Sequence, residues 1–175
     1  MEPGTEFLDR SQYFLTRELL PKIRAAILRM NEEDLWWRPN DTSNSIGNLM
    51  LHLAGNVRQW IVSGVGGAAD VRRRQEEFDQ RAPIARDELL EQLTGAVEEA
   101  VAVIASLPRE RLAEEVEVQG RRVSALEAIY HVVEHFSMHT GQILYIAKLR
   151  SGTDLGFYEL VDEIPRARWE GSPRE

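Results

Sequence analysis

The sequence HVVEHFSMHTGQ at residues 131–142 holds three of the four histidines of the protein, at steps of four residues. On an α-helix, four residues turn about 400°, so His131, His135 and His139 would lie on one face, each roughly 40° from its neighbour. The outer two would be separated by about 12 Å along the helix axis, which is too far for one small ion. We therefore expect this helix to offer at most one adjacent pair of histidines to a metal.

The helix that carries these histidines has recognisable ends in the sequence. SALE at residues 124–127 is a capping box, which predicts that the helix begins just upstream of His131. Apolar residues then recur at helical spacing as far as Ala147. Ser151 and Gly152 follow, and a glycine at this place is typical of a helix C-terminus.

Three further segments have the apolar period of an amphipathic helix. His52 lies in the one that runs from about residue 44 to residue 64. The others cover about residues 5–30, where Pro21 should kink or divide the helix, and about residues 85–107. Four such segments predict an all-α fold, a four-helix bundle, in which sites are built from side chains on facing helices.

Two short connections have distinct predictions. The polar connection after the first helix contains Trp36 and Trp37, which we expect to plug one end of the bundle rather than to line a pocket. Residues 114–123 alternate between apolar and polar side chains, which predicts a short hairpin before the fourth helix, turning at Gln119 and Gly120.

The connection between the second and third helices is long and highly charged. Residues 68–83 mix arginines with acidic residues, which is typical of a solvated loop. An anion-binding arginine cluster is the alternative. For that alternative, four side chains are candidates for holding an anionic substrate: Arg58, Arg72, Arg73 and Arg74.

Length and composition limit the class of protein. A chain of 175 residues is the size of one domain, and we expect a single domain over residues 1–165 with a polar tail over residues 166–175. The absence of cysteine excludes disulfides, thiolate metal sites and a cysteine nucleophile. A net charge of −8 disfavours nucleic acid as a partner. Because the sequence shows neither a signal peptide nor a membrane-length apolar run, we expect a cytoplasmic protein with no membrane contact.

Two of the histidines of the fourth helix are expected to lie on its apolar face. His135 and His139 point close to the direction of Val132 and Ile143, so they should face the bundle interior, where an imidazole must be paired or ligated. Two hydrogen-bonded core histidines and a metal-binding pair both fit this spacing. His52 on a facing helix is the natural third ligand, and a shell of three imidazoles would leave a position open to water or substrate.

The sequence allows more than one role for His131 and for several polar residues near the expected ligands. His131 shares a face with Glu127 and Glu134, so it is either a partly exposed histidine beside carboxylates or a further ligand or proton shuttle. Four polar residues lie within one turn of the expected ligands and could orient an imidazole: Asn48, Asn56, Glu134 and Gln142.

Two stretches of sequence carry a family resemblance. NSIGNLMLHLAGN at residues 44–56 and HFSMHTGQ at residues 135–142 resemble the DinB-like superfamily, over about residues 7–150. The similarity is closest to a subfamily of unknown function, marked by GNVRQW at residues 55–60. The resemblance implies an up-down-down-up bundle, often dimeric, with a long crossover between helices 2 and 3. It also implies a divalent metal held by His52, His135 and His139.

The resemblance also implies a chemistry. Relatives include transferases and isomerases that use bacillithiol, mycothiol or glutathione, with the metal thought to lower the pKa of the thiol. A chain without cysteine suits such a cosubstrate, because the nucleophile arrives with the ligand. One position departs from many relatives, which have Arg where this chain has Thr140.

These observations lead to a preferred function and two alternatives. We expect a homodimeric, metal-dependent enzyme that acts on a small molecule, a thiol-dependent transferase or a hydrolase-like catalyst. A non-catalytic binding or stress-response bundle with a structural ion is the first alternative, and a dimeric scaffold with packed histidines is the second. Zinc suits three imidazoles, and nickel or iron would accept the same ligands.

Overall fold

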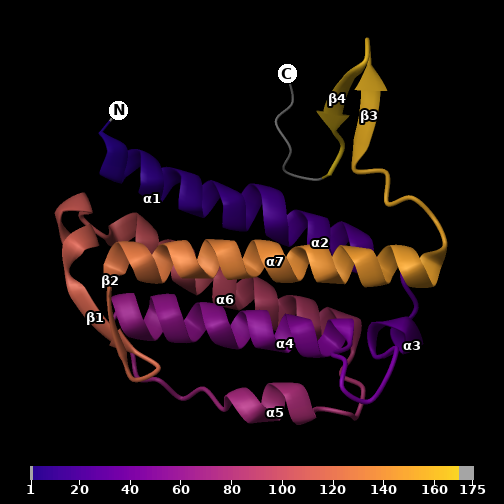
Figure 1. Cartoon of the computed structure of the whole chain (residues 1–175), viewed down its shortest axis with the longest axis horizontal. Helices are drawn as coiled ribbons and strands as arrows, with labels where there is room; N and C mark the ends of the chain where they lie inside the picture. Colours follow the sequence, from indigo (N-terminus) through magenta and orange to yellow (C-terminus); the bar gives the residue numbers. More distant parts are fainter. Residues whose placement is uncertain (1, 170–175) are drawn as a thin grey trace.

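Four long helical segments lie side by side in the computed structural model, which describes residues 2–169 (Figure 1). The fold is therefore mostly helical, as predicted, and two small antiparallel sheets accompany the helices. The four segments are α1 (Pro3–Tyr13) with the π-helical turn η1 (Phe14–Leu19) and α2 (Leu20–Ile27); α4 (Ile46–Val57) with the π-helix η2 (Arg58–Val65); α6 (Arg86–Ser106); and α7 (Ala125–Ser151).

The core lies between these helices and consists mainly of aliphatic side chains, with Phe136 and Trp60 among them. α4 packs against α6 and α7, and α2 packs against α7, so each long segment contributes one apolar face. No helix within residues 2–169 is long and apolar enough to span a lipid bilayer. Side chains exposed by less than 2% include Ile23, Ile27, Leu53, Ile61, Leu89, Leu93, Ile104 and Phe136.

Pro21 interrupts the first segment without dividing it. The turn before it widens into η1, where the Leu20 N–H bonds to the Leu15 carbonyl, five residues back. Pro21 has no N–H to offer the carbonyl of Arg17, four residues back. That carbonyl accepts a hydrogen bond from Trp169 Nε1 at 2.8 Å, so Trp169 supplies a donor that proline cannot.

The two tryptophans after the first segment lie in different environments. A short helix, α3 (Glu32–Leu35), precedes them. Trp36 packs over Gly47, where a Cβ would lie 2.7 Å from the indole ring, and its Nε1 donates to the Ile84 carbonyl at 3.1 Å. Trp36 is thus packed against the core. Trp37 instead lies along a surface cleft with the Arg150 guanidinium 4.8 Å from its ring centroid.

The long crossover contains a helix that the sequence did not predict. α5 (Arg74–Asp79) lies alongside α4 on the outer side of the bundle (Figure 1). Its sequence, RQEEFD, has one apolar residue and therefore no amphipathic period. Asn48 fastens it to α4, because its Nδ2 donates to the carbonyls of Glu77 at 2.8 Å and Gln80 at 3.1 Å.

The predicted hairpin and the start of the last long helix are confirmed. β1 (Glu115–Val118) pairs antiparallel with β2 (Arg121–Ser124), after the 3₁₀ turn η3 (Arg109–Ala113). Both turn residues have positive φ, 54° at Gln119 and 69° at Gly120, as a two-residue type I′ turn requires. The Ser124 side chain accepts from the Glu127 N–H and so caps α7, which ends at Gly152 with φ of 64°.

The C-terminal residues depart from the predicted polar tail. β3 (Tyr158–Val161) and β4 (Ile164–Ala167) form a second hairpin, so the start of the segment predicted as tail belongs to a strand. Trp169 follows and is only 6% exposed, with Lys22 Nζ 3.9 Å from its ring centroid. The Trp169 indole is therefore held by three contacts, with the Phe157 ring, the Lys22 ammonium and the Arg17 carbonyl. Residues 170–175 lie outside the described residues.

Candidate metal centre

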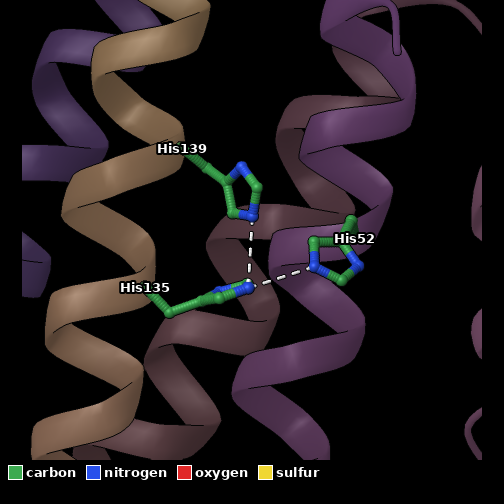
Figure 2. Close-up of side chains that lie close together, drawn as sticks. All are labelled: His52, His135 and His139. Carbon is green, nitrogen blue, oxygen red and sulfur yellow. Dashed lines mark hydrogen bonds between the residues drawn. The ribbon is translucent and has the colours of Figure 1, made fainter. Parts of the chain in front are cut away.

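The structure brings His52, His135 and His139 together between α4 and α7 (Figure 2). His135 Nε2 lies 3.1 Å from His52 Nε2 and 3.1 Å from His139 Nε2. The candidate ligand atoms of all three lie within 4.8 Å of one another. Four-coordinate zinc with Zn–N bonds of about 2.0–2.1 Å separates its ligand nitrogens by about 3.3 Å. The three histidines could therefore hold a divalent ion.

Glu77 on α5 fixes the ring of His52. Its Oε2 lies 3.0 Å from His52 Nδ1, and its two oxygens accept from Arg72 Nε at 2.7 Å and Arg72 Nη2 at 2.8 Å. A carboxylate only accepts, so the shared proton is on His52 Nδ1 and the Nε2 lone pair is left to face the other histidines. Phe78, the next residue, covers the ring at 4.7 Å between centroids.

The charge on Glu77 is secured by its partners. Burial alone would raise the pKa of this carboxyl group, but hydrogen bonds from Arg72 and His52 outweigh burial and hold the pKa below its ordinary value. Arg72 Nη2 also lies 3.1 Å from His52 Nδ1. Because both are donors when Glu77 is ionised, we assign the bonds of both groups to the carboxylate.

Gly55 makes room for this pair. It lies one turn after His52 on α4, and a Cβ built on it would overlap Glu77 Oε1 and lie 2.8 Å from Arg72 Nε. Any larger residue would push the Arg72–Glu77 pair off the helix. The centre therefore requires glycine at position 55.

Gln142 fixes His139 in the same way from within α7. Its Oε1 lies 2.7 Å from His139 Nδ1, so His139 Nδ1 donates and its Nε2 carries the lone pair. Burial is the main cause that lowers the pKa of His139. A neutral imidazole with its free nitrogen directed inward is the form that binds a metal.

His135 lies between the other two ligands and is the most perturbed titratable group of the centre. Burial, followed by the charges of His139 and His52, lowers its pKa to about 3. Its Nδ1 is buried and has no hydrogen-bond partner among residues 2–169. Its Nε2 can donate a hydrogen bond to His52 Nε2 or to His139 Nε2, but not to both, although both of these nitrogens are acceptors. A cation among the three lone pairs would satisfy all of them, so the donor set fits a metal.

His131 lies one turn away from this cluster. Its ring packs on Trp60 with 4.0 Å between centroids, and its Nε2 lies 3.4 Å from Asn56 Nδ2. Burial lowers its pKa. The cluster of candidate ligands does not include it, so His131 packs beside the centre as a half-buried ring.

The four polar residues predicted to orient an imidazole are placed differently from one another. Gln142 contacts His139, as described above. Asn56 contacts His131. Asn48 bonds to the backbone of α5 and so acts on His52 only through Glu77. Glu134 is exposed, and its effect on the centre is the charge that it presents to His131 and His139.

Each of the four arginines predicted to hold an anion has an intramolecular contact, and three of them, Arg58, Arg72 and Arg73, line one cavity beside α5. Arg72 binds Glu77, and Arg58 binds the Glu99 carboxylate at 3.0 and 3.1 Å. Of the other two, Arg73 pairs with Glu76, and Arg74 stacks on Phe78. Only Arg72 contacts the histidine cluster, and it does so as a support for Glu77.

The residues that sequence reasoning missed are Glu77 and Phe78. Both lie in a charged segment without periodicity, 25 residues or more from His52, so no local signal marks them. The signal that exists is indirect. Gly55 leaves a gap beside His52, and a charged crossover of suitable length follows.

Three solved structures are similar to this fold. A DinB-like protein from Bacillus subtilis has a TM-score of 0.62 at 20% identity, over 87% of this chain and 96% of its own. A DinB-like protein from Bacillus cereus has a TM-score of 0.64 at 14% identity, over 86% and 94%. A conserved protein from Enterococcus faecalis has a TM-score of 0.61 at 16% identity, over 86% and 96%. At these identities the likeness concerns the fold.

The family assignment rests on the sequence itself. No curated protein matches the chain. The model of a family described as "Protein of unknown function (DUF1572)" matches residues 3–162, nearly the whole of the described chain. The helical fold, the histidine cluster and the DinB-like neighbours agree with the resemblance read from residues 44–56 and 135–142. The chain belongs to the DUF1572 family, and its fold is similar to that of the DinB-like proteins.

Proposed function

We propose that this protein is a metal-dependent enzyme acting on a small molecule, with a divalent ion held by His52, His135 and His139. The observation that supports it is the convergence of three Nε2 atoms, two of them held as acceptors by Glu77 and Gln142. When bound, the ion would supply Lewis-acid chemistry that lowers the pKa of a thiol or water. The protein's own groups fix the ring protons on the outer nitrogens and, through Phe78, shield His52 from solvent.

We further propose that the reaction is thiol-dependent, with bacillithiol, mycothiol or glutathione as cosubstrate. The support is that the chain has no cysteine, so a sulfur nucleophile must come with a ligand. Zinc is the ion that best suits three imidazoles, and nickel or iron would accept the same donors.

Three finer parts of the sequence prediction also remain proposals. The up-down-down-up order of the bundle is supported by the long crossover that contains α5 (Figure 1). A homodimer is supported by exposed apolar side chains on α7, such as Leu126 and Tyr130, and light scattering would test it. A role for Arg58 or Arg73 toward an anion is supported by their position on one cavity of about 540 Å³ beside α5.

A thiol-transfer screen tests the proposed activity. The full chain, loaded with zinc, nickel or iron, is assayed with each thiol and an aromatic electrophile such as 1-chloro-2,4-dinitrobenzene. We expect turnover that chelation abolishes and that is lost in a His139→Ala variant. Turnover equal in the chelated and loaded protein would refute a metal-dependent reaction.

A structural ion is the alternative function, and the burial of His52 favours it. This side chain is only 4% exposed and lies beneath Phe78, as a ligand of a closed structural site would. Chelation separates the two. A structural ion predicts a large fall in the melting temperature with no transfer activity to lose under any cosubstrate.

A further inference from the structure

A surface cleft adjoins the candidate metal centre on the side of Gln142. It encloses about 770 Å³, within the usual range for small-molecule sites. Its walls come from the connection between α3 and α4, from Leu49 of α4, and from the outer face of α7. The lining residues are Trp37, Pro39, Thr42, Ser43, Asn44, Leu49, Met138, Gly141, Gln142, Tyr145, Ile146 and Leu149.

The lining of this cleft is uncharged, although the protein has a net charge of −8. None of the side chains that line the cleft is ionisable near neutral pH. Aromatic and aliphatic side chains share the lining with the hydroxyl groups of Thr42 and Ser43 and the amide groups of Asn44 and Gln142. The nearby Arg150, which stacks on Trp37, is already paired with Asp34. A charged ligand entering the cleft would therefore lose water without gaining an unpaired opposite charge, whereas an uncharged ligand would not bear that cost.

The cleft is connected to the histidines through single residues. Gln142 lines it while its Oε1 accepts from His139 Nδ1, and Met138 is the residue before His139. Leu49 lies one turn before His52 on α4. A molecule in the cleft therefore touches side chains adjacent to ligands on both helices.

The second large cavity gives the contrast. It lies on the other side of α4, beside α5, and its lining includes Arg58, Arg72, Asp70, Glu77 and Glu99. Arg58 pairs with Glu99 and Arg72 pairs with Glu77, and the cavity meets the centre at the Arg72–Glu77 pair. The uncharged cleft is the better entrance for an organic substrate.

We infer that the cleft is the binding site for an uncharged, largely apolar organic substrate, of the size of a substituted aromatic ring. This rests on the proposed function for its chemistry, since the cleft would present that substrate to the metal centre past Gln142. The hydroxyl and amide groups of Ser43, Asn44 and Gln142 suit one or two polar atoms on the ligand.

Methionine methyl resonances allow a direct test. Met138 lines the cleft and is 47% exposed, whereas Met30 and Met50 are 6% and 1% exposed and serve as internal references. The full chain, labelled with ¹³C at the methionine methyl groups, is titrated with benzyl alcohol, benzoate and benzylamine, which share a ring and differ in charge. We expect benzyl alcohol to shift Met138 alone, at concentrations about 10-fold lower than either charged probe.

A charge introduced into the cleft should reverse this preference. A Cβ at Gly141 would have no neighbour within 4 Å, so Gly141→Arg places a guanidinium in the cleft without disturbing the core. We expect this variant to bind benzoate more tightly than benzyl alcohol. The matched control is Ser137→Arg, on an exposed position of the same helix outside the cleft, which should keep the preference of the unmodified chain.

Several results would overturn the inference. They are no response of Met138, equal response to all three probes, equal shifts of Met30 and Met50, or a Met138 shift that follows protein concentration, which would indicate that a second copy covers the cleft. The titration is run on chelated and on metal-loaded protein with separate metal analysis. Loaded protein that contains metal but does not bind benzyl alcohol defeats this inference alone. Protein that binds benzyl alcohol but takes up no metal on loading defeats the proposed function alone.

Discussion

Glu77 Oε2 lies 3.0 Å from Nδ1 of His52, which is 25 residues away on another helix. The carboxylate reaches this position because Arg72 holds its oxygens, Asn48 holds its carbonyl and Gly55 has no side chain in the way. The crossover is thus not a passive linker. It sets the tautomer and the direction of one of the three histidines.

Replacing Glu77 by Gln should weaken metal binding while leaving the fold intact. The amide keeps the volume but loses the charge that holds the proton on His52 Nδ1, and loss of such a partner costs about 10- to 100-fold in metal affinity. Competition against a chromophoric chelator measures the change. Glu76→Gln is the control, because that neighbour pairs with Arg73 at the surface. Equal affinities of the two variants would contradict the role of Glu77.

Gly55→Ala should destabilise the protein although alanine favours a helix. In an open helical position this change stabilises by about 0.5–1 kcal/mol, but here the Cβ would overlap Glu77 Oε1. We expect a lower urea midpoint and weaker metal binding than in the unmodified chain. Gly95→Ala on α6 is the control, since its Cβ would make an ordinary 3.6 Å contact with Arg58. A Gly55→Ala variant as stable as Gly95→Ala would refute the close approach.

The stability of the metal-free protein should fall as the pH drops below about 6.5, the ordinary pKa of histidine. Burial lowers the pKa of His135 in the folded protein to about 3. Between pH 6.5 and pH 3, His135 therefore binds a proton in the unfolded chain but not in the folded protein. The contribution is fully present above pH 6.5 and is lost toward acid. Urea midpoints at pH 7.5, 6 and 5 measure it, above the range where carboxyl groups titrate. His135→Gln should flatten this dependence, and a flat profile in the unmodified chain would contradict the burial.

Trp169→Phe should lower stability without affecting the metal. The change removes the donor to the Arg17 carbonyl, which Pro21 cannot serve, and leaving such a group unpaired costs about 1–2 kcal/mol. Thermal unfolding measures the loss and chelator competition measures the metal affinity. Tyr158→Phe, at a side chain that is 57% exposed, is the control. A change in metal affinity would mean that the C-terminal hairpin acts on the centre.

The parts of the structure that the sequence predicts are those with local signals. Ser124 caps its helix within four residues, the hairpin turn lies at Gln119 and Gly120, and the spacing of His135 and His139 places both rings on one face. The choice of His52 as their partner required a second amphipathic face and was supported by resemblance.

The parts that it does not predict depend on distant contacts. Glu77 reaches His52 only because a short helix without apolar period docks on α4. Trp169 docks because a proline 148 positions earlier in the chain leaves the Arg17 carbonyl in need of a donor. In neither case does the sequence around one residue indicate its distant partner.

The central claim is that three histidines hold one divalent ion, and elemental analysis of tag-free protein tests it most directly. We predict one ion per chain in the unmodified protein and in His131→Ala, and almost none in His52→Ala, His135→Ala or His139→Ala. Circular dichroism checks that each variant is folded, and His→Gln versions replace any that are not. A folded His139→Ala variant that retains a full complement of metal would contradict the account.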